Sequence, residues 1–189
     1  LDICCARGSE MESLRMKMGM LFQSGALLNW MSIYDNVALP LRERTKLTEN
    51  EIHAKVCTIL DFLEMGDAAL KMPGEVSGGM VKRAGLARAI ICDPAIMLYD
   101  EPTSGLDPLM SRKIDSLIKS LKKKFSMTSV VVTHDLVSAF SIGDKIAMLY
   151  DGVVHEQGTI DEFMKSQKPL VREFISAQYG NGSDRKAKI

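Results

Sequence analysis

The sequence has few cysteines, few aromatic residues and no excess of charge of either sign. Its 189 residues include four cysteines and one tryptophan, and 24 basic side chains balance 24 acidic ones. The cysteines form no C-x-x-C pair, so their spacing indicates reduced thiols rather than a metal or redox site. The charge balance argues against a nucleic acid as partner, because nucleic-acid binding requires a basic face.

Long apolar runs are also missing. No run approaches the ~20 residues that a helix needs to cross a bilayer, and Asp2 and Arg7 interrupt the start, which therefore lacks the apolar core of a secretory signal. The sequence begins with Leu1, so we expect a fragment whose true start lies upstream. We expect one domain over residues 1–179 and a flexible tail over residues 180–189.

Apolar patterning predicts strands that alternate with helices. Strands are expected at residues 16–22, 95–99 and 129–132, and the last two are uninterrupted apolar runs of the kind that is buried on both faces. In the first strand, Met16, Met18 and Met20 alternate with other residues, so the methionines should form its buried face. Helices and strands in alternation predict an α/β fold with a largely parallel sheet, which binds ligands at the carboxyl ends of its strands.

Local signals predict the remaining elements. Residues 24–40 read as loop and short helix, and Thr48 with Glu51 forms a capping box for a helix that Gly66 stops. Asp151-Gly152 predicts a hairpin between residues 145–150 and 153–157. Further helices are expected over residues 77–91, 109–124, 136–142, 160–166 and 170–177.

Reactive side chains follow two of the predicted strands. Asp100 and Glu101 come directly after residues 95–99, and His134 follows residues 129–132. An Asp in this position commonly ligates Mg²⁺ beside phosphates, a Glu can orient or deprotonate an attacking water, and a His can contact a transferred phosphoryl group. The simpler alternative is that Asp100 caps a helix and His134 is a core residue. Two strand ends together favour the chemical interpretation.

A third segment, Ser77-Gly78-Gly79, begins a predicted helix. Glycines let a ligand approach the backbone, and the free N–H groups of a helix N-terminus favour anions. By itself such a triplet usually makes only a turn and a cap.

In this order the segments resemble the motifs of the nucleotide-binding subunit of ABC transporters. Gln23 resembles the Q-loop glutamine and Glu101 the catalytic glutamate, while His134 resembles the switch histidine. Val76–Met80 is similar to the signature motif, 96–100 to Walker B and Ser104–Asp107 to the D-loop. The resemblance implies an α/β, P-loop NTPase-like ABC ATPase fold, with a mostly parallel sheet and a helical subdomain at about residues 24–90.

The resemblance also implies roles for these residues, with ATP and Mg²⁺ as cofactors. Glu101 and His134 would be catalytic, and Asp100 and Gln23 would ligate Mg²⁺. Nucleotide contacts are implied for Gln23, Ser77, Gly78, Gly79, Met80, Asp100 and Asp107. Two copies would bind ATP head to tail, so that the Ser77 segment of one copy faces the phosphates held by the other.

The implied location is the cytoplasm, peripheral on the inner face of the cell membrane, beside an integral membrane permease. Five apolar residues after Gln23 are expected to line the permease groove, namely Leu27, Leu28, Trp30, Met31 and Tyr34. The alternative is that they form local core of the helical subdomain.

Finer features resemble the ATPases of Mla-type, MCE-linked lipid transporters of bacterial envelopes. They are the segments 21–27, 34–43 and 169–174, and Met80 in place of the usual glutamine. This resemblance implies phospholipid transport between envelope membranes with an MCE-type substrate-binding protein. The alternatives are another ABC importer or exporter, an ABC ATPase acting on DNA or ribosomes, and an inactive remnant. ABC ATPases that act on DNA or ribosomes usually carry long insertions, and the sequence has none.

The sequence departs from the family in one respect. It contains no G-x-x-x-x-G-K-[ST] motif, and the glycines before Gln23 are Gly8 and Gly19. The P-loop backbone and its lysine supply most of the phosphate binding in such sites. We therefore expect a domain without the first part of its core, which alone would not hydrolyse ATP.

Overall fold

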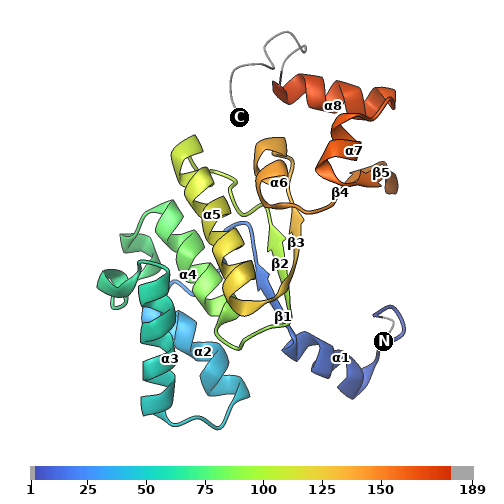
Figure 1. Cartoon of the computed structure of the whole chain (residues 1–189). Coiled ribbons are helices and arrows are strands. Elements are labelled where there is room, and N and C mark those ends of the chain that lie inside the picture. The colour runs from blue at the N-terminus through green and yellow to red at the C-terminus, as the bar shows by residue number, and fades with distance from the viewer. Residues whose placement is uncertain (1–2, 180–189) are drawn as a thin grey trace. The chain divides into compact units, whose positions relative to one another are not determined.

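A computed structural model describes residues 3–179 (Figure 1). The expected tail over residues 180–189 lies outside this range. The chain divides into two compact units, Leu1–Val132 and Thr133–Ile189. Each unit is described by itself.

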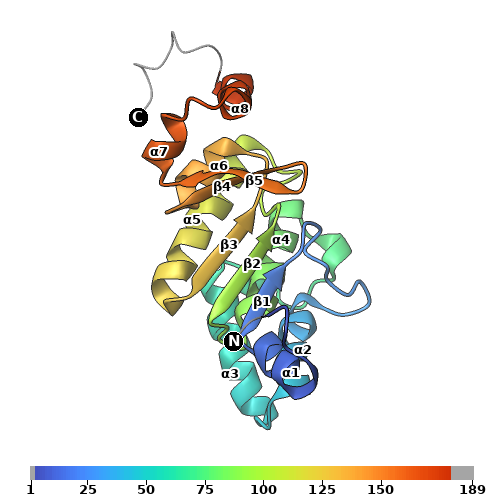
Figure 2. The ribbon, with the colours of Figure 1, turned by 90° about the vertical axis from the view of Figure 1, so that its right-hand side faces the viewer.

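The first unit contains a parallel sheet of three strands. They are β1 (Met18–Leu21), β2 (Ile96–Asp100) and β3 (Thr128–Val132), in the order β1-β2-β3. Leu21 pairs with Tyr99, and Asp100 pairs with Val132. All three strands run in one direction (Figure 2), so the segments after β1 and β2 begin at the same edge of the sheet. The predicted α/β fold with a parallel sheet is confirmed.

One face of β1 and β2 is buried and the other face of β2 is half-buried, whereas β3 has no fully buried residue. Leu21, Met97 and Tyr99 have exposed fractions of 0, 0 and 1%, whereas Val130 and Val132 expose 50 and 61%. The prediction that the second and third strands are buried on both faces is therefore wrong.

The buried face of β1 also differs from the prediction. Gly19 and Leu21 are buried, Met20 is exposed, and Met16 belongs to the preceding helix. The physical reason is close packing against α4, because a Cβ on Gly19 would lie 2.3 Å from the carbonyl oxygen of Ala89. A glycine at this position lets the helix approach the strand.

Helices accompany the sheet in the first unit. They are α1 (Gly8–Met16), α2 (Ile33–Arg44), α3 (Glu49–Phe62), α4 (Gly78–Ile90) and α5 (Pro108–Phe125), with the 3-10 turns η1 (Gly66–Ala68) and η2 (Pro73–Glu75). The capping box of Thr48 and Glu51 is present at the start of α3. Helix α3 ends at Phe62, and Glu64, two residues later, lies in the left-handed region at φ 55°, so the chain has left the helix before Gly66. Helix α2 continues through Pro40, past the loop and short helix expected there.

In its described residues, 133–179, the second unit contains a hairpin and three helices. Its elements are α6 (Leu136–Ile142), β4 (Ile146–Tyr150), β5 (Val153–Gly158), α7 (Ile160–Met164) and α8 (Pro169–Tyr179). Asp151 and Gly152 join the antiparallel strands with φ of 49° and 76°, as the predicted hairpin requires. Phe163, Val171 and Ile175 are central to its buried core.

Candidate functional site

Two segments that the sequence marked as motifs meet after β1. Gln23 follows this strand, and its Nε2 donates a hydrogen bond to Oγ of Ser104 at 3.0 Å. Ser104 lies in the turn after β2, close behind Asp100 and Glu101. The structure therefore brings the predicted Q-loop glutamine to the predicted D-loop.

Lys82 of α4 connects the same two segments through hydrogen bonds to their backbones. It is 5% exposed, and its ammonium donates to the carbonyl oxygens of Gln23 and of Glu101, the latter at 3.2 Å. Burial lowers the pKa of Lys82, and the nearby carboxylates of Asp100 and Glu101 oppose that shift. Lys82 thus fastens the backbone on both sides of the site to α4.

Sequence reasoning did not single out Lys82. The signal was nevertheless present, because Gly79, Gly85 and Leu86 lie three or four residues away on the same face of α4 and are all buried. A lone lysine on an otherwise small and apolar helix face indicates a buried polar contact.

The backbone of Glu101 adopts an unusual conformation. Its φ is 44°, in the left-handed region, and its N–H donates to the carbonyl of Val132 at 2.9 Å. The Ser104 N–H donates to the carbonyl of Glu101 at 3.1 Å. A residue other than glycine in this region costs free energy, and such strain clusters at functional sites. This outlier supports a functional role for Glu101.

The donors at this edge suit a magnesium ion with phosphates. Asp100 is half-buried at the end of β2, and Gln23 offers an amide oxygen. Over residues 3–179, no group of three or more His, Cys, Asp or Glu side chains is placed to hold a metal. Mg²⁺ commonly takes one or two carboxylates together with substrate oxygens, so this donor set fits it.

Ser77 caps α4, as the sequence predicts. Its Oγ accepts a hydrogen bond from the Met80 N–H at 3.4 Å. Gly79 is buried against α5, where a Cβ would lie 2.6 Å from Cε of Met110, whereas Gly78 is exposed. Because the tip of the flexible Met110 side chain can shift, packing alone does not require a glycine at position 79. The exposed backbone at Ser77 and Gly78 is the part that a ligand can reach.

Two other predicted site residues lie at the starts of helices: Asp107 is the N-cap of α5, and His134 precedes Asp135, the N-cap of α6. Asp107 accepts hydrogen bonds from the N–H groups of Leu109 and Met110 at 2.9 and 3.0 Å, and so caps α5. His134 belongs to the second unit, where its carbonyl accepts a hydrogen bond from Nε2 of Gln178. Its ring is exposed, so it is not a core residue.

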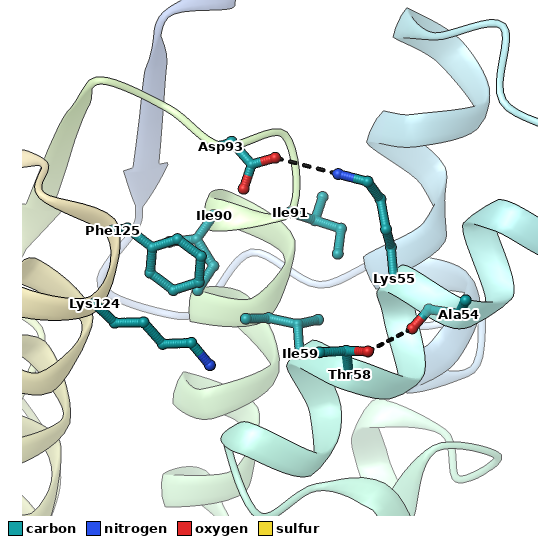
Figure 3. A pocket seen from close by; sticks show the side chains of 9 residues that line it. All are labelled: Ala54, Lys55, Thr58, Ile59, Ile90, Ile91, Asp93, Lys124 and Phe125. Atoms are coloured by element: carbon teal, nitrogen blue, oxygen red, sulfur yellow. Dashed lines mark hydrogen bonds and ion pairs between the residues drawn. The ribbon is translucent and has the colours of Figure 1, made fainter.

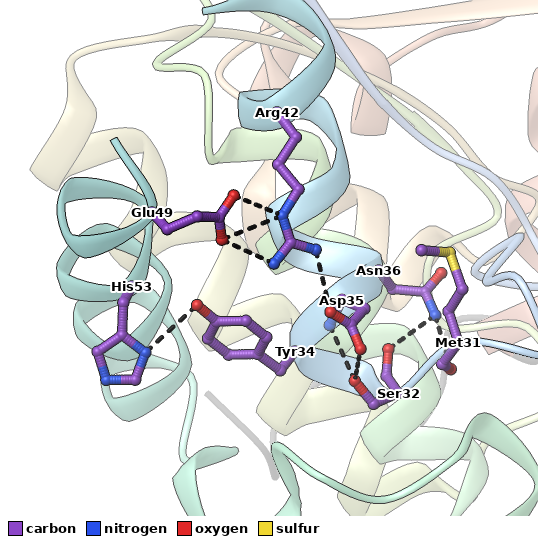
Figure 4. Close-up of polar contacts among 8 residues, drawn as sticks. All are labelled: Met31, Ser32, Tyr34, Asp35, Asn36, Arg42, Glu49 and His53. Atoms are coloured by element: carbon purple, nitrogen blue, oxygen red, sulfur yellow. Dashed lines mark hydrogen bonds and ion pairs between the residues drawn. The ribbon is translucent and has the colours of Figure 1, made fainter. Parts of the chain in front are cut away.

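A buried asparagine shapes the loop after Gln23. Asn36 is 0% exposed, and its Nδ2 donates to the carbonyls of Leu28, Met31 and Ser32 at 3.0, 3.1 and 3.0 Å. Its Oδ1 accepts from the Leu28 N–H at 2.8 Å. Figure 4 shows Asn36 pointing at the backbone of this loop. These bonds fix the loop in one conformation.

The same loop presents Trp30 to solvent. Trp30 is 75% exposed, so the core alternative for this residue is wrong. Leu27, Leu28, Met31 and Tyr34 are half-buried. Arg88 of α4 donates to the carbonyls of Gly25 and Ala26 at 3.2 and 2.7 Å, which anchors the start of the loop.

Comparisons with known proteins identify the family of the chain. The sequence model of the ABC transporter family matches residues 4–104. The chain belongs to the ABC transporter family. No helix within residues 3–179 has the length and apolar character to span a membrane.

Proteins with similar sequences are named as ATP-binding proteins of transport systems. The chain is 44% identical over 177 residues to the intermembrane phospholipid transport system ATP-binding protein MlaF of Haemophilus influenzae, and 40% identical over 167 residues to MlaF of Escherichia coli. It is 41% identical to the probable ribonucleotide transport ATP-binding protein mkl of Mycobacterium tuberculosis. These matches cover 94, 88 and 94% of this chain and 67, 62 and 49% of the relatives. The chain thus spans about half to two thirds of their length.

A solved structure shows the same fold. It is the dimeric ATP-binding cassette MJ0796 in a post-hydrolysis state with ADP and Pi, at a TM-score of 0.73 and 32% identity. The match covers 82% of this chain and 68% of that one.

Proposed function

We propose that the chain is part of the ATP-binding and ATP-hydrolysing subunit of a bacterial ABC transporter that moves phospholipid between envelope membranes. The observation that carries the proposal is the hydrogen bond between Gln23 and Ser104. It occurs together with the hydrogen bonds from Lys82 to the carbonyls of Gln23 and Glu101. The amide of Gln23, the carboxylates of Asp100 and Glu101, and the strained backbone of Glu101 thus lie at one edge of the sheet in a member of the ABC transporter family. The MlaF names of similar proteins support phospholipid as cargo.

In the proposed mechanism Asp100 and Gln23 would hold Mg²⁺, which when bound would neutralise charge on the phosphates of ATP. Glu101, whose backbone is in the left-handed region, would orient the attacking water and accept its proton. Lys82 keeps the Gln23 and Glu101 backbones in place, and His134 contacts the transferred phosphoryl group.

A second copy of the subunit completes the proposed site. Ser77 and Gly78, with the buried Gly79 and the half-buried Met80 behind them, would face phosphates held by the other copy. The free N–H groups at the start of α4 suit an anion. Asp107 would contact the nucleotide from the D-loop. The dimeric state of MJ0796 supports this arrangement.

The proposed partners outside the dimer are a membrane permease and an MCE-type substrate-binding protein. The permease would dock on the loop that exposes Trp30, because a rigid loop with an exposed aromatic side chain is a typical anchor. The subunit would then be cytoplasmic, peripheral on the inner face of the cell membrane.

Ribonucleotide transport is a second candidate because the mycobacterial relatives carry that name. The deciding experiment uses the purified transporter in liposomes and measures ATP hydrolysis and release of a labelled phospholipid to acceptor vesicles. ATP-dependent phospholipid transfer supports the proposal. ATP-dependent transport of a labelled ribonucleotide other than ATP, with no phospholipid transfer, would replace it with the second candidate.

A further inference from the structure

A pocket of about 300 Å³ lies in the first unit, between α3, the end of α4 and the end of α5 (Figure 3). This volume is at the lower end of the range for small-molecule sites, about 300 to 1,000 Å³. The residues that line it include none of those assigned to the nucleotide site. The pocket is therefore separate from the proposed nucleotide site.

The floor of the pocket is apolar. It is formed by Ile59, Ile90 and Ile91, with exposed fractions of 6, 1 and 5%, and by the ring of Phe125. Figure 3 shows these side chains converging from α3 and from the ends of α4 and α5. A floor without polar side-chain atoms favours an apolar group, because burial removes apolar surface from water.

One side of the rim carries an ammonium without an acidic partner. Nζ of Lys124 lies 3.8 Å from the centroid of the Phe62 ring and 5.6 Å from that of Phe125. Aromatic faces attract a cation but do not replace a carboxylate acceptor. In the described part of the chain, Lys124 forms no ion pair.

The other side of the rim carries an ion pair. Nζ of Lys55 lies 3.2 Å from Oδ2 of Asp93, and the two side chains are 46 and 62% exposed. Exposed pairs of this kind are weak, so the ammonium remains available to a further anion. Together the rim offers two ammonium groups against one carboxylate.

We propose that this pocket binds a single-chain anionic amphiphile, with its apolar chain on the isoleucine floor and its head group between Lys124 and Lys55. A neutral apolar ligand would cover Lys124 without pairing it, and a cationic amphiphile would oppose two ammonium groups. Either a carboxylate or a phosphate head group meets the same requirement. Such a ligand would join α3 to the ends of α4 and α5.

The test is a titration of the chain, labelled at isoleucine methyl groups, below the aggregation concentration of each probe. The probes are decanoate, decyl phosphate and 1-decanol. At least one anionic probe should shift the methyl signals of Ile59, Ile90 and Ile91 and bind about tenfold more tightly than decanol, since a charge-assisted contact is added. The tighter of the two anions identifies the head group.

Two variants locate the site. Lys124→Met keeps the length of the side chain and removes its charge, so anion binding should weaken about tenfold while decanol binding stays unchanged. Thr58→Phe fills the mouth from an exposed position and should weaken all three probes. Lys119→Met, on an exposed position of the same helix outside the pocket, is the matched control.

Three results would overturn the proposal. In the first, the anions and decanol bind with equal affinity. In the second, Lys124→Met and Lys119→Met change anion binding equally. In the third, none of the probes shifts the isoleucine methyl signals. Thermal melting of each variant separates a lost site from a lost fold.

Discussion

The side chains of Gln23 and Ser104 share a hydrogen bond of 3.0 Å although 81 residues separate them in the chain. Each residue follows a strand of the same parallel sheet, and the register of β1 with β2 places both turns at one edge. Nε2 of the Gln23 amide is the donor in this bond, so Oε1 is the atom that we propose as the magnesium ligand.

Removing this hydrogen bond should loosen the proposed magnesium site. We expect Ser104→Ala in the assembled transporter to raise the Mg²⁺ concentration for half-maximal ATPase activity about threefold to tenfold, since one orienting bond is lost. The measurement is ATPase rate against Mg²⁺ concentration at saturating ATP. Ser116→Ala, at an exposed position of α5, is the control. An unchanged Mg²⁺ dependence in Ser104→Ala would remove this role from the bond.

Asn36 should be a stability residue. Asn36→Ala removes the acceptor of the buried Leu28 N–H and the side-chain donor of three loop carbonyls, of which those of Leu28 and Ser32 keep a backbone donor. The free energy of unfolding should therefore fall by about 2 to 3 kcal/mol. Urea unfolding of the chain measures the effect. Asn50→Ala, an exposed position of α3, should change it by less than about 0.5 kcal/mol. Similar losses in both variants would contradict the role assigned to Asn36.

Trp30 should matter for assembly and not for folding. A buried aromatic residue costs about 3 to 5 kcal/mol when truncated, but Trp30 is 75% exposed. Trp30→Ala should leave the melting temperature nearly unchanged and reduce co-purification with the membrane permease. Leu70→Ala is the control, because Leu70 is 86% exposed outside this loop. Normal assembly of Trp30→Ala would move the docking site elsewhere.

Acid should weaken the start of α2. The hydroxyl of Ser32, and then the guanidinium of Arg42 at 3.0 Å, lower the pKa of Asp35 (Figure 4). A lowered pKa means that the folded state favours the carboxylate. The contribution of Asp35 is therefore present above the unfolded-state pKa of about 3.9 and is lost as pH falls through the folded-state value.

A comparison of stability at two pH values measures this contribution. Asp35→Asn should be less stable than the parent chain at pH 7, by less than about 1 kcal/mol because the pair is partly exposed. The difference should disappear near pH 2. Asp67→Asn is a control at an exposed position outside the network. A deficit in Asp35→Asn that persists at pH 2 would show that the carboxylate charge is not its cause.

Features that depend on neighbours in the chain were predictable from the sequence. The Thr48 and Glu51 capping box and the Asp151-Gly152 turn each use residues within one turn of one another, so their chemistry fixes the local backbone. The parallel sheet followed from the alternation of strands with helices. The order of motifs along the chain also indicated the family.

Features that depend on distant contacts were not predictable in the same way. The buried face of β1 is set by the approach of Ala89 to Gly19, which no local alternation of methionines reveals. The Lys82 contacts join residues from three segments, so only the folded chain shows them together. Helix α3 ends at Phe62, before Gly66, and Glu64 just after it adopts the left-handed conformation although it is not a glycine.

ATP turnover by the assembled transporter with Glu101→Gln tests the central claim most directly. This substitution keeps the shape of the side chain and removes the carboxylate, so ATP binding should persist while hydrolysis falls by roughly 10²-fold or more. Glu43→Gln, on the exposed surface of α2, should hydrolyse ATP at the parent rate. Parent-level hydrolysis in Glu101→Gln, with ATP binding intact, would contradict the assignment of Glu101 as the base.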